Sequence, residues 1–224
     1  MRIEGSYKAA YLAGVDVAFN NRIEKLKKVS YDGAIDVQYG IYLDEPYRGC
    51  FSINFKPSKQ GVDWWYNLRG LPKKTDEGNV HKGYYKEIEK YWLEIKKDII
   101  NIVSKYQFID LSKGIVLAGR SKGAGEALLL IPHMAELGPI KLCMAIEPPK
   151  VCDYDYGSYL WSLCNMIMTT SYKNDIVTGI PPWFKYEGIH FQNGKRKLGL
   201  SIKDHEEATT KEQIWYDFIK ELEK

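Results

Sequence analysis

The sequence predicts an α/β domain with a mostly parallel central sheet flanked by helices and an antiparallel hairpin on one side. Short apolar segments alternate with amphipathic segments at helical spacing through the second half of the chain. The segment 114–119 is apolar throughout, which is typical of a strand covered on both faces. Two strand-like segments joined by a turn precede them and predict the hairpin.

The individual elements follow from apolar spacing and turn residues. The segment 5–28 carries apolar residues at helical spacing and predicts one surface helix or two short ones. Val37–Leu43 and Cys50–Phe55 are strand-like, and a turn beginning at Asp44 connects them as the hairpin. The other predicted elements are a helix over 84–106, strands over 114–119, 142–146 and 166–170, and helices over 126–137 and 210–222.

Length and composition bound the class of protein. The chain has 224 residues, of which 45% are hydrophobic, 27% charged and 13% aromatic, and this predicts a single globular domain over 1–224. The net charge of +3 is too small to favour a nucleic-acid partner. Neither composition nor charge predicts an oligomeric state.

Targeting and metal-binding patterns are weak. No apolar run approaches the roughly 18 residues that a membrane span requires. The first residues lack the apolar region of a signal peptide, so we expect a cytoplasmic protein. The four cysteines form no CxxC pair and no zinc-ligand spacing with the four histidines. We therefore expect free thiols, no metal and no cofactor.

A candidate nucleophile lies between an apolar strand and a helix. Gly119–Gly123 fits the pattern G-x-S-x-G around Ser121. A serine on a sharp strand-to-helix turn needs glycine two residues to either side, because a larger side chain there would collide with its neighbours. The alternative is a serine that only caps the helix. The spacing of a phosphate-binding loop is absent.

A serine nucleophile requires a histidine base and an acid that orients it. His205 lies after the last apolar strand, in a predicted loop before the final helix. His133 falls inside a helix, where packing is the simpler role, and His81 and His190 fall in predicted loops. Asp175 follows a predicted strand, at the sheet edge where catalytic loops gather. The rival acids are Asp153, Asp155 and Asp204.

Several blocks, taken in order, resemble the class 3, or fungal-type, lipases of the α/β-hydrolase fold. The resemblance covers about 37–205. Its blocks are Ile53–Ser58 (family F-R-G-[ST]), Gly61–Leu68 (D-W-x-x-D-L), Val80–Tyr84 (V-H-x-G-F), Val116–Gly125 (V-x-x-G-H-S-L-G-G-A), Glu147–Val151 (G-x-P-R-V) and Asn174–Pro182 (N-x-x-D-x-V-P-x-L-P-P).

The resemblance implies an α/β-hydrolase fold and roles for particular residues. Ser121 would be the nucleophile, His205 the general base and acid, and Asp175 its orienting partner. Ser58 and the backbone N–H of Lys122 would form the oxyanion hole. The order serine, aspartate, histidine is the one expected for this fold.

The sequence departs from the family pattern close to the serine. Arg120 replaces a histidine, Lys122 replaces an apolar residue, and Pro57 replaces a glycine beside the oxyanion residue. Pro57 removes one backbone N–H, so the oxyanion hole is expected to differ slightly. The two cations either favour an acidic or phosphorylated substrate, or point into solvent or pair with local acids.

The segment Gly61–Leu71 occupies the position of the lipase lid. Trp65 and Tyr66 would be available to contact substrate or a lipid interface if this segment opens. The alternative is a fixed core helix.

Together these observations predict a serine hydrolase that cleaves carboxylic esters, of the lipase or esterase type, through an acyl-enzyme. The expected partners are an ester or lipid substrate and, transiently, a membrane or lipid interface. Two alternatives remain. One is a catalytically silent interaction or ligand-binding scaffold with this fold. The other is an acyltransferase or thioesterase that uses the same three residues.

Overall fold

The computed structural model describes residues 5–57, 71–182, 184, 189–195 and 201–222. Their central feature is a seven-stranded sheet with the strand order β1-β2-β3-β6-β7-β8-β9. A separate small sheet pairs β4 with β5. The strands are β1 (Ile23–Tyr31), β2 (Ile35–Tyr42), β3 (Phe51–Phe55), β4 (Pro72–Lys74), β5 (Asn79–His81), β6 (Ile115–Arg120), β7 (Ile140–Ile146), β8 (Ile167–Tyr172) and β9 (Ile189–Asn193).

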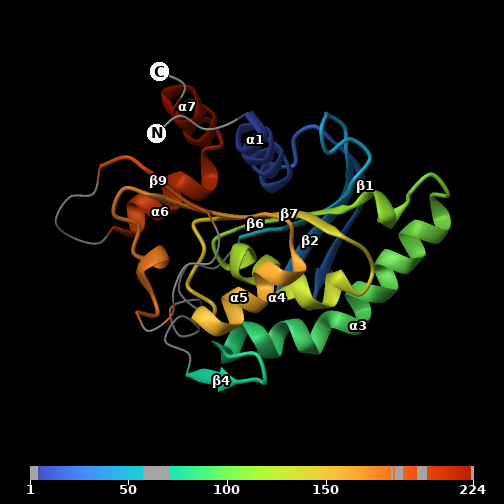
Figure 1. Cartoon of the computed structure of the whole chain (residues 1–224), viewed down its shortest axis with the longest axis horizontal. Coiled ribbons are helices and arrows are strands. Elements are labelled where there is room, and N and C mark those ends of the chain that lie inside the picture. The colour runs from blue at the N-terminus through green and yellow to red at the C-terminus, as the bar shows by residue number, and fades with distance from the viewer. Residues whose placement is uncertain (1–4, 58–70, 183, 185–188, 196–200, 223–224) are drawn as a thin grey trace.

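Helices cover both faces of this sheet (Figure 1). α1 and α7 lie on one face, and α3, α4 and α5 lie on the other. The helices are α1 (Gly5–Phe19), α3 (Lys82–Lys105), α4 (Lys122–Ala135), α5 (Tyr154–Leu163), α6 (Ile202–Thr210) and α7 (Gln213–Leu222), with 3-10 turns η1 (Leu111–Lys113) and η2 (Val177–Gly179).

The sheet is parallel from β3 to β9 and antiparallel from β1 to β3. The predicted mostly parallel sheet and its antiparallel hairpin, β2 and β3, are therefore confirmed. Because β3, β6, β7, β8 and β9 run the same way, the carboxyl ends of β6, β7 and β8 meet at one edge. The loops that carry the candidate site residues begin there.

The helical prediction for 5–28 is wrong after Phe19, because Ile23–Tyr31 is the edge strand β1. The pairing register shifts between Lys25 and Lys27, so Leu26 is an extra residue at a β-bulge. The bulge interrupts the two-residue alternation of a strand. Apolar residues then recur every three residues, at Ile23, Leu26 and Val29, which resembles helical spacing.

α1 is a helix, but it is buried rather than on the surface. Its residues from Ala10 to Ala18 lie almost wholly inside the molecule, against the sheet and beside α7. A Cβ on Gly14 would lie 2.5 Å from Cβ of Met144 on β7, so the glycine permits this close approach. A helix that is apolar on most sides is typical of a core position.

Two hydrophobic clusters fill the two sides of the sheet. One packs α3, α4 and α5 against it, and the other packs α1, α7 and Ala208 of α6 against the opposite face. None of the described helices is long and apolar enough to cross a membrane.

Candidate active site

Ser121 lies on the turn between β6 and α4, with a φ of 53° and a ψ of −125°. A non-glycine residue adopts this backbone only when its surroundings impose it. A Cβ on Gly119 would collide with the carbonyl of Gly123, and one on Gly123 would lie 2.5 Å from the carbonyl oxygen of Phe55. The glycine pattern therefore has the steric cause inferred from the sequence. The side chain of Ser121 makes no capping bond to the helix, which argues against the alternative role as a cap.

His205 lies in the first half of α6, not in a loop as predicted. α6 begins at its cap Ser201, whose hydroxyl accepts a hydrogen bond from the backbone N–H of Asp204. The Ser201 backbone N–H also donates to the carbonyl oxygen of Asn174, at 2.8 Å. This bond ties the helix that carries His205 to the loop that carries Asp175.

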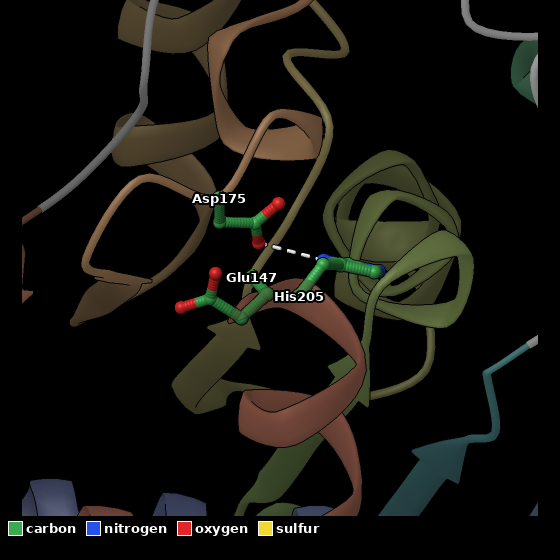
Figure 2. Close-up of side chains that lie close together, drawn as sticks. All are labelled: Glu147, Asp175 and His205. Carbon is green, nitrogen blue, oxygen red and sulfur yellow. Dashed lines mark hydrogen bonds and ion pairs between the residues drawn. The ribbon is translucent and has the colours of Figure 1, made fainter. Parts of the chain in front are cut away.

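The three candidate residues form one hydrogen-bonded chain. Nε2 of His205 lies 2.7 Å from Oγ of Ser121, and Nδ1 of His205 lies 2.6 Å from Oδ2 of Asp175. Figure 2 shows the second of these bonds. The other carboxylate oxygen of Asp175 accepts from the backbone N–H of Val177 at 2.7 Å. All three side chains are almost buried, because Ser121 is 9% exposed and Asp175 and His205 are each 5% exposed. Bulk water therefore has little access to these hydrogen bonds.

The other aspartates and histidines considered for the triad bind different partners or lie elsewhere. Asp153 caps α5 and accepts from Asn79 and from the backbone N–H of Tyr156. Asp155 is exposed, and Asp204 accepts from the backbone N–H of Asn174. His81 caps α3, His133 stacks on Trp92 and contacts Glu89, and His190 lies in β9 rather than a loop, between the hydroxyls of Thr169 and Ser171.

Only part of the predicted oxyanion hole falls within the described residues. Ser58 lies outside them, as do Trp65 and Tyr66 of the predicted lid. Lys122 is the first residue of α4, directly after Ser121. An N–H at the first position of a helix has no carbonyl one turn earlier to bind, so it can donate to an anion at the helix N-terminus.

The side chains of Arg120 and Lys122 bind other residues and point away from Ser121. Arg120 donates to the carbonyl oxygen of Thr209 at the end of α6, and its guanidinium lies 4.4 Å from the ring centre of Phe19. Burial lowers the pKa of Arg120 to about 10, which leaves it charged at neutral pH. Arg120 is therefore held by a carbonyl oxygen and an aromatic ring, and only Lys122 shows the expected pairing with local acids.

Lys122 enters a buried ion cluster between α3 and α4. Its ammonium contacts the carboxyl groups of Glu126 and Glu87, and it donates to the carbonyl oxygen of Ala34 at 2.8 Å. Burial opposes the charge on Lys122, but attraction to the two carboxyl groups outweighs it and raises the pKa of Lys122. Burial also raises the pKa of Glu126 to about 8.

Replacing Lys122 with methionine is expected to lower the free energy of unfolding by about 3–5 kcal/mol, because buried carboxyl groups lose their cation. The matched control is Lys211→Met, which removes the exposed pair with Glu207. It should change the free energy of unfolding by less than about 1 kcal/mol. Urea unfolding of the two variants measures the difference. Equal losses would mean that the buried cluster contributes no more than a surface pair.

Glu147, for which no sequence motif predicted a role, follows β7 and lies beside Asp175 (Figure 2). Three side chains each place one possible metal-ligand atom within 4.8 Å of the other two: Glu147, Asp175 and His205. Both ring nitrogens of His205 already bind Asp175 and Ser121, so this arrangement suits proton transfer better than metal ligation. The signal in the sequence was a glutamate where the resembling block has glycine.

A serine on a strand-to-helix turn, bonded to a histidine that is bonded to an acid, defines a serine hydrolase of the α/β-hydrolase class. Comparison with known proteins refines this class. A family model described as "Lipase (class 3)" matches 52–185, more than half of the chain. The chain therefore belongs to the class 3 lipase family and is a carboxylic ester hydrolase.

Solved structures share the fold at low sequence identity. A triacylglyceride lipase from Rhizomucor miehei is 15% identical with a TM-score of 0.65, covering 86% of this chain and 82% of that one. A triacylglycerol lipase whose catalytic centre is described as a serine protease triad is 15% identical with a TM-score of 0.70, covering 96% and 94%. A triacylglycerol lipase from Penicillium expansum is 10% identical with a TM-score of 0.66, covering 88% and 82%. No curated protein sequence matches the chain significantly.

Proposed function

We propose that the chain hydrolyses carboxylic esters through Ser121, His205 and Asp175. The observation that supports this most strongly is the pair of hydrogen bonds, 2.7 and 2.6 Å long, that joins the serine to the histidine and the histidine to the acid. We also propose that the chain acts as one catalytic domain, since both hydrophobic clusters pack on the same sheet.

Acylation begins when Nε2 of His205 takes the proton from Oγ of Ser121 as that oxygen attacks the ester carbonyl. Asp175 holds Nδ1–H of His205 and stabilises the imidazolium that forms. The imidazolium then gives its proton to the leaving alcohol, and the acyl group remains on Ser121. In the second half-reaction His205 takes a proton from water, and the water oxygen attacks the acyl carbon. The bond from the acyl carbon to Oγ of Ser121 then breaks, the imidazolium returns its proton to Oγ, and the carboxylic acid is released.

The oxyanion of each tetrahedral intermediate accepts hydrogen bonds from the backbone N–H of Lys122 and from Ser58. The N-terminus of α4 favours negative charge at this place. Removing one such donor typically lowers the rate about 100- to 1,000-fold.

We propose an uncharged ester or lipid substrate that meets the enzyme at a lipid interface, with Trp65 and Tyr66 on the contacting segment. Arg120 binds the carbonyl oxygen of Thr209, and Lys122 binds two glutamates. These contacts support an uncharged substrate, because they direct both cations away from the serine. A fungal lipase with the same fold is described with a model for interfacial activation.

Hydrolysis of p-nitrophenyl acetate, butyrate, octanoate and palmitate tests the function. We expect turnover, with a chain-length optimum that separates an esterase from a lipase. Matched thioesters and an added alcohol acceptor detect thioesterase and acyltransferase activity. An organophosphonate should add once, on the peptide that contains Ser121, as mass spectrometry will show. Neither turnover nor an adduct would support the catalytically silent scaffold instead.

A further inference from the structure

Glu147 is the most deeply buried carboxyl group beside the proposed triad. It has no exposed surface, and it directly follows β7, the strand between those that precede Ser121 and Asp175. Its φ of 53° is unusual for a residue with a side chain. Its backbone N–H is held at 3.4 Å from the hydroxyl oxygen of Thr170 on β8. The surrounding strands therefore impose the position from which its carboxyl group faces Asp175 (Figure 2).

The surroundings of this carboxyl group disfavour its charged form. Neither oxygen has a hydrogen-bond partner of normal geometry among the described residues, and the nearby backbone N–H of Tyr172 only partly offsets the effect of burial. An ionised carboxylate without donors inside a protein is very costly, so the group keeps its proton. Desolvation, and then the neighbouring Asp175, raise the pKa of Glu147 well above its usual range. The titratable groups that face it are Asp175, Asp204, His205 and Tyr11, and three of these can only add negative charge.

A protonated carboxyl group has one donor, which needs an acceptor. Asp175 is the acceptor beside it, with an oxygen of each carboxyl group within 4.8 Å of the other. Its oxygens take hydrogen bonds from Val177 and His205, and a carboxylate has about four acceptor sites, so capacity remains. Two carboxyl groups this close share one negative charge and one proton more easily than they carry two charges.

We propose that Glu147 is a positioning residue, whose protonated carboxyl group donates a hydrogen bond to Asp175 and holds that carboxylate against His205. This inference rests on the proposed triad. Glu147 itself contacts no reacting atom. It adds a fourth member to the hydrogen-bonded series of Ser121, His205 and Asp175, and holds the Asp175 carboxylate in its orientation.

Two variants of similar volume separate donation from space filling. Glu147→Gln keeps a donor without a charge, and Glu147→Leu keeps neither. For p-nitrophenyl butyrate at neutral pH, we expect Glu147→Leu to lower kcat about 10- to 100-fold with KM within twofold, because a misoriented base slows chemistry and not binding. We expect Glu147→Gln to stay within about threefold of wild type. Unchanged kcat in the leucine variant, or equal losses in both, would overturn the proposal.

The pH profile supplies a second readout. Wild type should lose kcat/KM at alkaline pH, where Glu147 ionises beside Asp175, and Glu147→Gln should lack this limb. Glu126→Gln is the matched control, since Glu126 is also a fully buried glutamate with a raised pKa, but it bonds to Lys122. It should keep the wild-type profile. The same profile in wild type and Glu147→Gln would contradict the proposal.

A measurement independent of turnover separates this inference from the proposed function. The Nδ1–H proton of His205 is expected to give a downfield NMR resonance, assigned by its absence in His205→Ala. It should persist in Glu147→Gln and shift or broaden in Glu147→Leu. If no ester is hydrolysed but this difference is seen, the function is wrong and the positioning role stands. Identical resonances in wild type, Glu147→Gln and Glu147→Leu would overturn the positioning role.

Discussion

Replacing Ser121 with alanine is expected to lower kcat for p-nitrophenyl ester hydrolysis by about a million-fold. The hydroxyl oxygen is the atom that becomes acylated, and an alanine methyl group cannot form that bond. His205 would then have no serine proton to take, and only the oxyanion donors and substrate binding would remain. KM should change little, because the lost interaction is made in the transition state.

The matched control for this variant is Ser158→Ala on α5. Ser158 is exposed, and its hydroxyl donates to the carbonyl oxygen of Tyr154 within the same helix. We expect wild-type kcat in this variant and the same thermal midpoint within a few degrees. If Ser121→Ala kept a tenth of the wild-type kcat, while circular dichroism showed it folded, another residue would be the nucleophile.

Replacing Asp175 with asparagine is expected to lower kcat about 10,000-fold. The side-chain amide has nearly the same shape, but its nitrogen can only donate. A donor facing Nδ1 of His205 favours the tautomer that carries its proton on Nε2, which cannot accept the proton of Ser121. The imidazolium also loses its neighbouring negative charge. Stopped-flow or long-time assays of kcat across pH measure this loss.

Asp153→Asn provides the comparison for Asp175→Asn. Asp153 is the rival acid that caps α5, where it accepts from the backbone N–H of Tyr156 at 3.0 Å. Asparagine also caps helices well, but its amide nitrogen cannot accept the bonds from Asn79, so we expect a modest loss of stability and full activity. A larger loss of kcat in Asp153→Asn than in Asp175→Asn would show that Asp153, and not Asp175, orients His205.

Elements whose pattern is local could be predicted from the amino-acid sequence alone. The wholly apolar segment 114–119 predicted β6, and two further short, mainly apolar segments predicted β7 and β8, because strands covered on both faces carry mainly apolar side chains. Six apolar residues that recur every three or four positions, from Ile88 to Ile102, predicted helix α3. The glycines around Ser121 predicted the strand-to-helix turn, since the steric requirement lies within five residues. Chain order and the resembling blocks then singled out Asp175 and His205 as candidates.

Tertiary structure decided the features that depend on distant neighbours. β1 is a strand because it pairs with β2, and its bulge hides the alternation that sequence analysis relies on. His205 lies in a helix because Ser201 caps that helix and binds the loop of Asp175. The side chain of Lys122 turns away from the serine because Glu87, 35 positions earlier in the chain, and Glu126 enclose its ammonium. The carboxyl group of Glu147 meets Asp175 because parallel strands bring their carboxyl ends together, and no local pattern records which side chains then face each other.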